Sequence, residues 1–264
     1  MGCGIINNNS SYIYTMRFLI FIILIFFLGL VIYNGVYLKS RTSSMAQTVQ
    51  FTTEDNTTIV ADFYPVEGSS LGVILVHMMP SDRKSWIPFA EKLKQAGFQV
   101  LAIDLRGHGE SQGGPSGYEK FSDTEHQNSY KDIAAADDFL RRKGATNINI
   151  AGASIGANLA LWYLADHAYV RSAVLLSAGF DYQGIQTGTS IGRVRRLQGV
   201  YFVGSAEDEQ SGASASDVAV KLFSLCGCIN KEVKEFNGAG HGTTMLDRNP
   251  EFMDRLIHWI RAQN

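Results

Sequence analysis

The 264-residue sequence predicts an α/β fold in which helices cover both faces of a mainly parallel sheet. Short apolar runs such as Val73–Val76 recur along the chain, as is typical of strands buried on both faces. Segments with helical spacing of apolar residues separate these runs. The 26 glycines against 5 prolines indicate many tight turns between strands and helices.

The pattern begins with a hairpin, whose strands we expect at residues 49–52 and 58–64 around a turn at Asp55-Asn56. Further strands are expected at 73–76, 100–103, 148–151, 173–176, 200–203 and 231–236, the last polar enough for a sheet edge. Helices are expected at 86–93, 130–140, 157–165, 218–225 and 250–260, with Pro250 at the start of the last. Because ligands bind at the carboxyl ends of such strands, we expect the chemistry there.

The sequence divides into four parts: a polar leader at 1–15, an apolar segment at 16–38, a polar linker at 39–48 and the folded domain at 49–264. Arg17 precedes an apolar run long enough for a membrane-spanning anchor. The same basic start suits a cleaved secretory signal, but no clean small-residue cleavage site follows, so an uncleaved anchor is favoured. A helix packed in the core would show a polar face, which this segment lacks. The signal-like start predicts a membrane-anchored or secreted protein whose catalytic domain lies outside the cytoplasm.

The net charge of −2 argues against a nucleic-acid partner, because it implies no basic binding face. Cys226 and Cys228 provide too few ligands for a zinc site. They are interpreted either as two small apolar thiols or, in an exported domain, as a disulfide. No metal or organic cofactor is predicted, and the sequence indicates no oligomeric state.

A candidate nucleophile stands directly after the predicted strand at 148–151, in Gly152-Ala153-Ser154-Ile155-Gly156. This is a G-x-S-x-G string between a strand and a helix, where a sharp turn exposes the serine hydroxyl above the sheet. The string alone is weak evidence, so this context carries the prediction. The competing interpretation is a glycine-rich turn with a surface serine.

A serine hydroxyl needs an adjacent base. Among the six histidines, His241 lies in a glycine-rich loop just beyond the last strand and is the predicted general base. Asp208, beyond the strand at 200–203, is the predicted acid that orients it, with neighbouring Glu207 as the second choice. The order serine, acid, histidine is the one this kind of fold uses.

These residues, together with the string Asp104-Leu105-Arg106-Gly107-His108-Gly109-Glu110-Ser111, resemble the α/β-hydrolase superfamily over residues 49–264. The resemblance implies that this string forms a structural turn, so His108 is not the base. It also implies an oxyanion hole formed by the backbone N–H groups of Met79 and Ile155, with Met78 in place of the family's usual glycine.

Relatives with a lid domain insert it between the strands that here end near Ser177 and begin at Gly199. About twenty residues separate these strands, which leaves room for a loop or a short helix, so no large lid domain and an open site are expected. The stretch 112–128, with Tyr118, Phe121 and His126, is expected to line one wall of the site.

The resemblance and the three side chains predict a serine hydrolase that cleaves an ester-like bond of a small-molecule acyl substrate through an acyl-enzyme. An acyltransferase, an amidase or a peptidase would use the same triad, so these alternatives stay open. A non-catalytic binding protein of the same fold is disfavoured, because such proteins usually lose a triad member.

Overall fold

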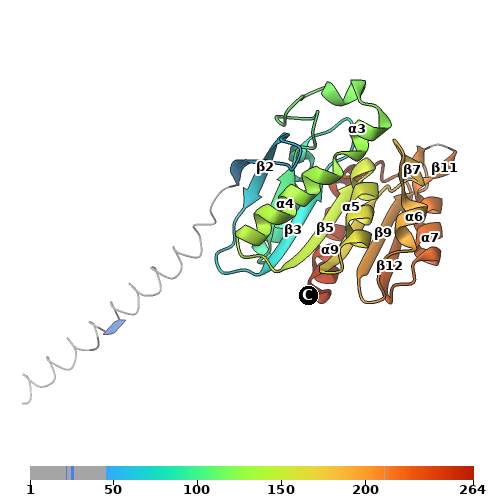
Figure 1. The fold of residues 1–264 in the computed structure, drawn as a ribbon. Coiled ribbons are helices and arrows are strands. Elements are labelled where there is room, and N and C mark those ends of the chain that lie inside the picture. The colour runs from blue at the N-terminus through green and yellow to red at the C-terminus, as the bar shows by residue number, and fades with distance from the viewer. Residues whose placement is uncertain (1–21, 23–24, 27–45, 211) are drawn as a thin grey trace, which may run out of the picture. The chain divides into compact units, whose positions relative to one another are not determined.

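An eight-stranded sheet forms the centre of residues 46–264 in the computed structural model, which describes residues 22, 25–26, 46–210 and 212–264 (Figure 1). In spatial order the strands are β1 (Gln47–Thr52), β2 (Thr58–Tyr64), β4 (Gln99–Ile103), β3 (Leu71–Val76), β5 (Asn147–Ala153), β6 (Val170–Leu176), β9 (Gly199–Ser205) and β12 (Asn230–Phe236). From β4 to β12 all neighbours pair in parallel, whereas β1 and β2 join antiparallel. The mainly parallel sheet is therefore confirmed.

Helices cover both faces of this sheet. The larger apolar cluster lies under α4 (Tyr130–Arg142), α5 (Ile155–Asp166) and α7 (Ala215–Leu225), and the second lies under α2 (Ile87–Gln95) and α9 (Pro250–Ala262). Successive side chains of β3 alternate between them, since Ile74 belongs to the first cluster and Leu75 to the second. Burial on both faces explains why the sequences of the central strands are unbroken apolar runs.

Shorter elements lie mostly in the connections at the carboxyl edge of the parallel strands. They are η1 (Arg83–Trp86), η2 (Gly117–Lys120), α3 (Asp123–Gln127), β7 (Asp181–Tyr182), β8 (Ile185–Gln186), α6 (Thr187–Ile191), β10 (Glu209–Gln210), β11 (Ala213–Ser214) and α8 (Thr244–Arg248). The connection between β6 and β9 holds only the β7–β8 hairpin and α6, so this fully described segment contains no lid domain.

The expected elements are present, with shifted ends. The hairpin pairs Thr52 with Thr58, and β12 occupies a sheet edge. The helix expected at 218–225 begins at Ala215 because the Ser214 hydroxyl accepts a hydrogen bond from the Asp217 amide and caps it. Helix α3 was not expected; the Ser122–Glu125 capping box that starts it is readable in the sequence.

The leader and most of the apolar segment at 16–38 lie outside the described residues, so the predicted apolar helix stays a prediction. Within the part of the chain that the structure describes, no helix combines the length and the apolar character needed to cross a membrane. Cys226 and Cys228 are both buried and joined by a disulfide, which is the second of the two alternatives for this pair.

A buried ion-pair cluster connects the loops after β3 and β4. The Asp104 carboxylate is fully buried and accepts hydrogen bonds from the Arg83 guanidinium, from the Arg83 amide at 2.7 Å and from the Glu110 amide at 2.8 Å. Arg83 also pairs with Asp62 at 3.0 Å. Because a buried charge is stable only with its partners in place, this cluster fixes both loops at the carboxyl edge.

We predict that Asp104→Asn lowers the free energy of unfolding by about 3 kcal/mol, because it leaves the buried Arg83 without one of its counter-charges. The matched control is Asp254→Asn, which breaks a solvent-exposed pair with Lys92 and should cost under about 1 kcal/mol. Urea denaturation followed by circular dichroism measures both. Equal effects of the two substitutions would contradict the assigned role of the cluster.

Candidate active site

Ser154 stands at the turn between β5 and α5, with φ 54° and ψ −120°. A positive φ is rare for a residue with a side chain and is retained only where the surroundings enforce it. Here they do: a Cβ atom at Gly152 would overlap the backbone of Gly156, and one at Gly156 would overlap the carbonyl of Val76. The two glycines of the motif are thus required by direct packing of backbone on backbone.

His241 lies beyond β12 with its Nδ1 atom 2.8 Å from both carboxylate oxygens of Asp208. The Asp208 side chain is almost completely buried, whereas the imidazole is about a quarter exposed. An ionised carboxylate accepts hydrogen bonds and cannot donate one, so Nδ1 carries the proton and Nε2 is the basic nitrogen. The residue after the histidine, Gly242, packs against Ala153, which places the histidine loop beside the nucleophile turn.

Glu207, the second candidate for the acid, makes its hydrogen bonds to other groups than the imidazole of His241. Its carboxylate accepts hydrogen bonds from the amides of Gly240 and Gly238, each at 2.7 Å, and from the Ser205 hydroxyl at 2.7 Å. The hydrogen bond from Gly240, followed by that from Ser205, lowers the pKa of Glu207 to about 2. Glu207 therefore binds the backbone of the histidine loop, whereas Asp208 binds the imidazole.

The loop that carries the predicted oxyanion donor Met79 follows β3 and is shaped by His77. The Nε2 atom of this buried imidazole accepts a hydrogen bond from the Leu105 amide at 3.0 Å, and Nδ1 donates to the Met78 carbonyl at 2.9 Å. Burial lowers the pKa of His77 to about 4, so the ring is neutral and has one fixed tautomer. The neutral ring holds the turn that presents Met79.

The predicted oxyanion donors lie on two adjoining turns. A Cβ atom at Gly156 would also meet the His77 carbonyl at 2.6 Å, so the start of α5 packs directly on the loop that carries Met79. The Ile155 amide belongs to the first turn of α5, where amides lack an acceptor inside the helix. Met78 covers Gly242, since a Cβ atom there would overlap its sulfur.

Two further residues in this region, Ser177 and Tyr182, were not predicted to take part in the site. The buried Ser177 hydroxyl accepts a hydrogen bond from the Gly242 amide at 2.9 Å, and the Ser177 carbonyl accepts one from the Tyr182 hydroxyl at 3.4 Å. Burial raises the pKa of Tyr182 to about 12, and a hydrogen bond with the Ser154 side chain offsets part of that rise. The β7–β8 hairpin therefore brings a phenol to the candidate nucleophile.

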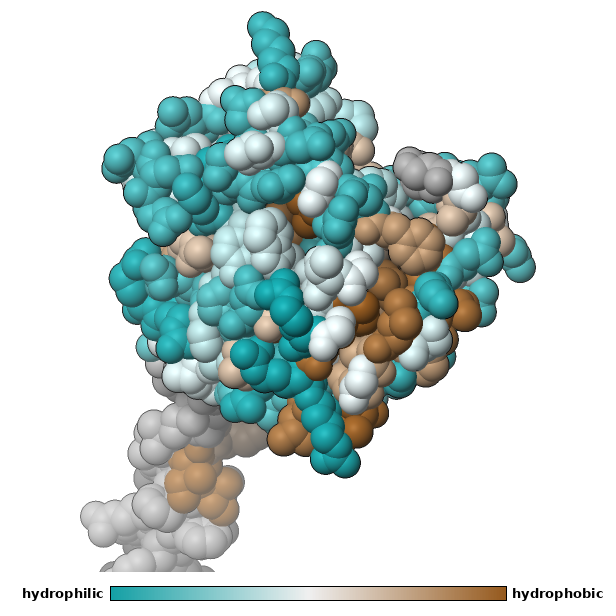
Figure 2. All heavy atoms as spheres, turned by 45° about the vertical axis from the view of Figure 1, so that its right-hand side comes forward, coloured by the Kyte–Doolittle hydropathy of each residue, from teal (hydrophilic) through white to brown (hydrophobic). Residues whose placement is uncertain are grey.

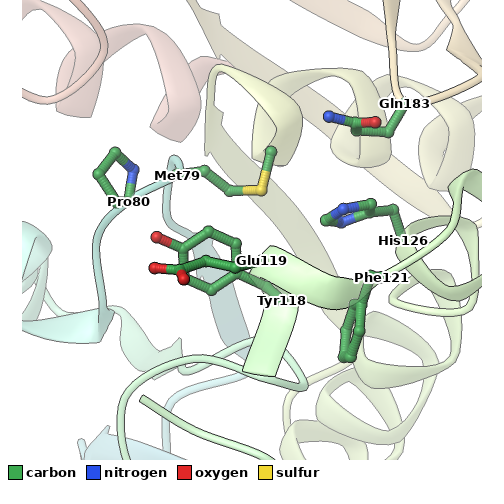
Figure 3. Close-up of a pocket in the computed structure, with 7 residues that line it drawn as sticks. All are labelled: Met79, Pro80, Tyr118, Glu119, Phe121, His126 and Gln183. Atoms are coloured by element: carbon green, nitrogen blue, oxygen red, sulfur yellow. The ribbon is translucent and has the colours of Figure 1, made fainter. Parts of the chain in front are cut away.

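A pocket of about 300 Å³ opens beside the loop after β3, at Met79 and Pro80 (Figure 3). The Met79 side chain extends across it toward the His126 ring, while Tyr118 and Phe121 line another side. Burial lowers the pKa of His126, which favours the neutral imidazole. The full lining is Met79, Pro80, Tyr118, Glu119, Phe121, His126 and Gln183. Tyr118, Phe121 and His126 of the stretch 112–128 thus line a cavity beside Met79.

The segment 104–111 forms a tight turn at the base of this pocket. The Gly107 position lies against the Phe121 ring and the Tyr118 amide, so a side chain there would collide with both. His108 is buried, stacks on the Tyr118 ring at 4.0 Å and has its pKa lowered to about 4 by burial. It supports the pocket wall and makes no contact with Asp208 or His241.

Comparison with known proteins identifies the family to which the chain belongs. Residues 73–212 match the model of the alpha/beta hydrolase fold family, which is more than half of the chain. The chain belongs to this family. This confirms the resemblance that the motifs indicated, and the α/β-hydrolase fold accounts for the strand order and the turn at Ser154.

The α/β-hydrolase is 27% identical over 132 residues to a thermostable monoacylglycerol lipase of Bacillus sp. (strain H-257), a match that spans about half the length of each protein. Its structure resembles the Pyrococcus furiosus esterase Pf2001, with a TM-score of 0.66, 19% identity and coverage of 83% of this chain and 92% of that one. It also resembles Est1E of Butyrivibrio proteoclasticus, solved with ferulic acid, with a TM-score of 0.65, 14% identity and coverage of 81% and 98%. At these identities the structural matches establish the fold alone.

We predict that Gly242→Ala lowers esterase turnover at least tenfold, because the new methyl group displaces Met78 and shifts the loop that carries His241. Gly238→Ala is the matched control in the same loop, since its φ of 72° is also positive but nothing lies within 4 Å of an added Cβ atom. Hydrolysis of p-nitrophenyl acetate by both variants measures the difference. Equal losses would mean that backbone strain, and not contact with Met78, decides the outcome.

Proposed function

We propose that this α/β-hydrolase is a serine esterase with Ser154 as nucleophile, His241 as general base and Asp208 as the acid that orients the imidazole. The observation that carries the proposal is the contact of His241 Nδ1 with both Asp208 oxygens, beside a serine held at positive φ between β5 and α5. The relatives support hydrolysis, because they include a lipase and esterases.

In the proposed mechanism, Ser154 attacks the ester carbonyl while Nε2 of His241 accepts the hydroxyl proton. The buried Asp208 carboxylate stabilises the imidazolium that results. His241 then returns the proton to the leaving alcohol, and an acyl-enzyme remains. Water deprotonated by the same imidazole attacks the acyl-enzyme, and the acid is released. The described side chains supply each proton transfer, and no metal or organic cofactor is proposed.

The N–H groups of Met79 and Ile155 are proposed to stabilise the oxyanion of the tetrahedral intermediates. Their two turns adjoin at Gly156, and the neutral His77 fixes the first of them. Preorganised amides of this kind contribute a large share of the rate, since removal of one donor costs about 10²–10³ in kcat.

The pocket beside Met79 supports a small substrate group with both apolar and polar surface. The rings of Tyr118 and Phe121 suit a flat or short apolar group, and the His126 imidazole and the Gln183 amide offer hydrogen bonds to an oxygen. We propose that it binds one side of a short or aromatic ester. The Tyr182 hydroxyl donates to the Ser177 carbonyl and lies near the Ser154 side chain, so it must turn away or make room when the substrate carbonyl arrives.

Residues 16–38 are proposed to attach the protein to a membrane or to direct its export, with the catalytic domain outside the cytoplasm. The support is the apolar run after Arg17, which is long enough to span a bilayer.

An acyltransferase, an amidase or a peptidase would use the same three side chains. Assays with a panel of esters, amides and acyl acceptors distinguish these activities from ester hydrolysis.

We predict that Ser154→Ala lowers kcat for short p-nitrophenyl esters by about 10⁴–10⁶-fold and abolishes labelling by a fluorophosphonate probe. The matched control is Ser224→Ala, at an exposed serine of α7, which should retain both rate and labelling. Full activity of Ser154→Ala would exclude Ser154 as the nucleophile. Absence of labelling in correctly folded wild-type protein would instead favour a binding protein of the same fold.

We predict that Asp208→Asn lowers kcat by about 10³–10⁴-fold, because an amide favours the wrong imidazole tautomer and does not stabilise the imidazolium. Glu207→Gln should lower kcat less than about tenfold while reducing the melting temperature, because the Gly238, Gly240 and Ser205 hydrogen bonds to Glu207 stabilise the loop backbone. Steady-state kinetics and thermal denaturation of both variants test this, and the reverse ranking in kcat would exchange the two roles.

A further inference from the structure

Large apolar side chains are exposed at the amino-terminal edge of the parallel strands, opposite the candidate active site. Leu197, just before β9, is 73% exposed, and Ile229, just before β12, is 54% exposed. Leu225 at the end of α7 and Tyr169 just before β6 are 49% and 40% exposed. Figure 2 shows apolar surface on the lower part of the face formed by α6, α7 and β12. Exposed apolar side chains gathered at one edge indicate a contact surface.

Basic side chains alternate with these apolar ones. The Ile229 amide donates a hydrogen bond to the Arg196 carbonyl at 3.0 Å, which holds the loops before β9 and β12 side by side. The Arg141 guanidinium lies 4.7 Å from the centre of the Tyr169 ring. The edge therefore offers cations and apolar groups within the same few loops.

The charges of residues 46–264 are unequally divided between the two edges of the sheet. Helices run opposite to the strands, so their basic carboxyl-terminal turns gather at the amino-terminal edge, where the exposed basic residues include Arg141, Arg142, Lys143, Arg195, Arg196 and Arg261. The carboxylates near them include Glu67, Asp138 and Asp166; Asp138 stands one helical turn before Arg142, and Asp166 is paired with Arg193. The opposite edge exposes Glu119, Asp123, Glu125, Asp181 and Glu209, together with the basic residues Lys84, Lys120 and Arg248.

The chain also enters the domain at the basic edge. β1 is antiparallel to β2, and β2 is antiparallel to β4, so β1 starts at the same edge as the parallel strands, with Gln47 as its first residue. Eight residues separate Leu38 from Gln47, which spans at most about 28 Å when extended. A segment inserted in a bilayer at residues 16–38 would therefore be joined to this edge by a linker no longer than that.

We propose that the basic edge, defined by Tyr169, Arg142, Arg196, Leu197 and Ile229, docks on a lipid bilayer that contains anionic headgroups. The guanidinium groups attract headgroup phosphates, and the apolar side chains enter the boundary between headgroups and acyl chains. The Tyr169 hydroxyl is bonded inward to the Asp137 carboxylate, so its partly exposed ring is the group that meets this boundary. The active site then opens away from the bilayer and takes its ester from water.

A second copy of this chain fits the surface less well. A two-fold interface would bring the same arginines of both copies together, and like charges repel.

The bilayer docking rests on the membrane attachment proposed above but is independent of the hydrolytic chemistry. Its test therefore measures contact with lipid and not turnover.

The experiment uses the full chain with Cys3→Ser, reconstituted with nanodiscs of phosphatidylcholine alone or with added phosphatidylglycerol. A fluorophore is attached through L197C or, as a matched control at the opposite edge, through T124C in α3. Headgroup spin-labelled lipid quenches fluorophores near the surface. We expect the L197C label to be quenched at least twofold more than the T124C label in the anionic nanodiscs, and this excess to shrink in phosphatidylcholine alone.

Charge reversal supplies the second arm. Arg142→Glu combined with Arg196→Glu should reduce quenching of the L197C label in anionic nanodiscs to its level in phosphatidylcholine, because the attraction to headgroups is lost. Lys120→Glu, a reversal at the opposite edge, should leave it unchanged. Equal quenching of the L197C and T124C labels, or quenching that depends on neither anionic lipid nor the two arginines, would overturn the proposal. Fluorophosphonate labelling of the same samples reports separately on the catalytic proposal.

Discussion

The candidate site depends on the direct packing of backbone on backbone at the carboxyl edge of the sheet. At Gly152, Gly156 and Gly204 an added Cβ atom would overlap main-chain atoms of a neighbouring turn, so strand ends and helix starts approach more closely than side chains allow. This approach keeps Ser154 at positive φ and places the Met79 loop against the start of α5. The position of the candidate nucleophile therefore follows from glycines that have no proposed part in the chemistry.

Two adjacent carboxylates divide the work of placing the histidine. Glu207 accepts two amides of the histidine loop and the Ser205 hydroxyl, while Ser177 accepts a third amide at Gly242. These contacts fix the backbone of the loop. Asp208 is then left to bind the imidazole itself, in a position with almost no solvent exposure. Because Glu207 holds the loop backbone, it can stay exposed, while Asp208 is buried where its charge interacts strongly with the imidazole.

The sequence predicted the sheet and the nucleophile turn because both depend on local patterns, namely apolar runs and a glycine-flanked serine between a strand and a helix. It ranked Asp208 above Glu207, but neighbouring carboxylates differ only in where the chain turns after β9, and that is settled by contacts with a loop some thirty residues away. Tyr182 and Ser177 were missed for the same reason. The Ser177 hydroxyl is bonded to Gly242, 65 residues away, and neither Ser177 nor Tyr182 has a local motif.

The direction of the parallel strands and of the helices between them determines which residues lie at each edge of the sheet. Parallel strands connected by helices must place every strand end, and so the candidate triad, at one edge, and the carboxyl-terminal turns of the helices at the other. Basic residues stabilise those helix ends by interaction with the helix dipole, so an excess of positive charge accumulates opposite the site. Leu197 and Ile229, however, gain nothing from a helix dipole and remain exposed to water. Their exposure is the part of this edge that fold stability leaves unexplained, and the proposed contact with a lipid bilayer would remove both side chains from water.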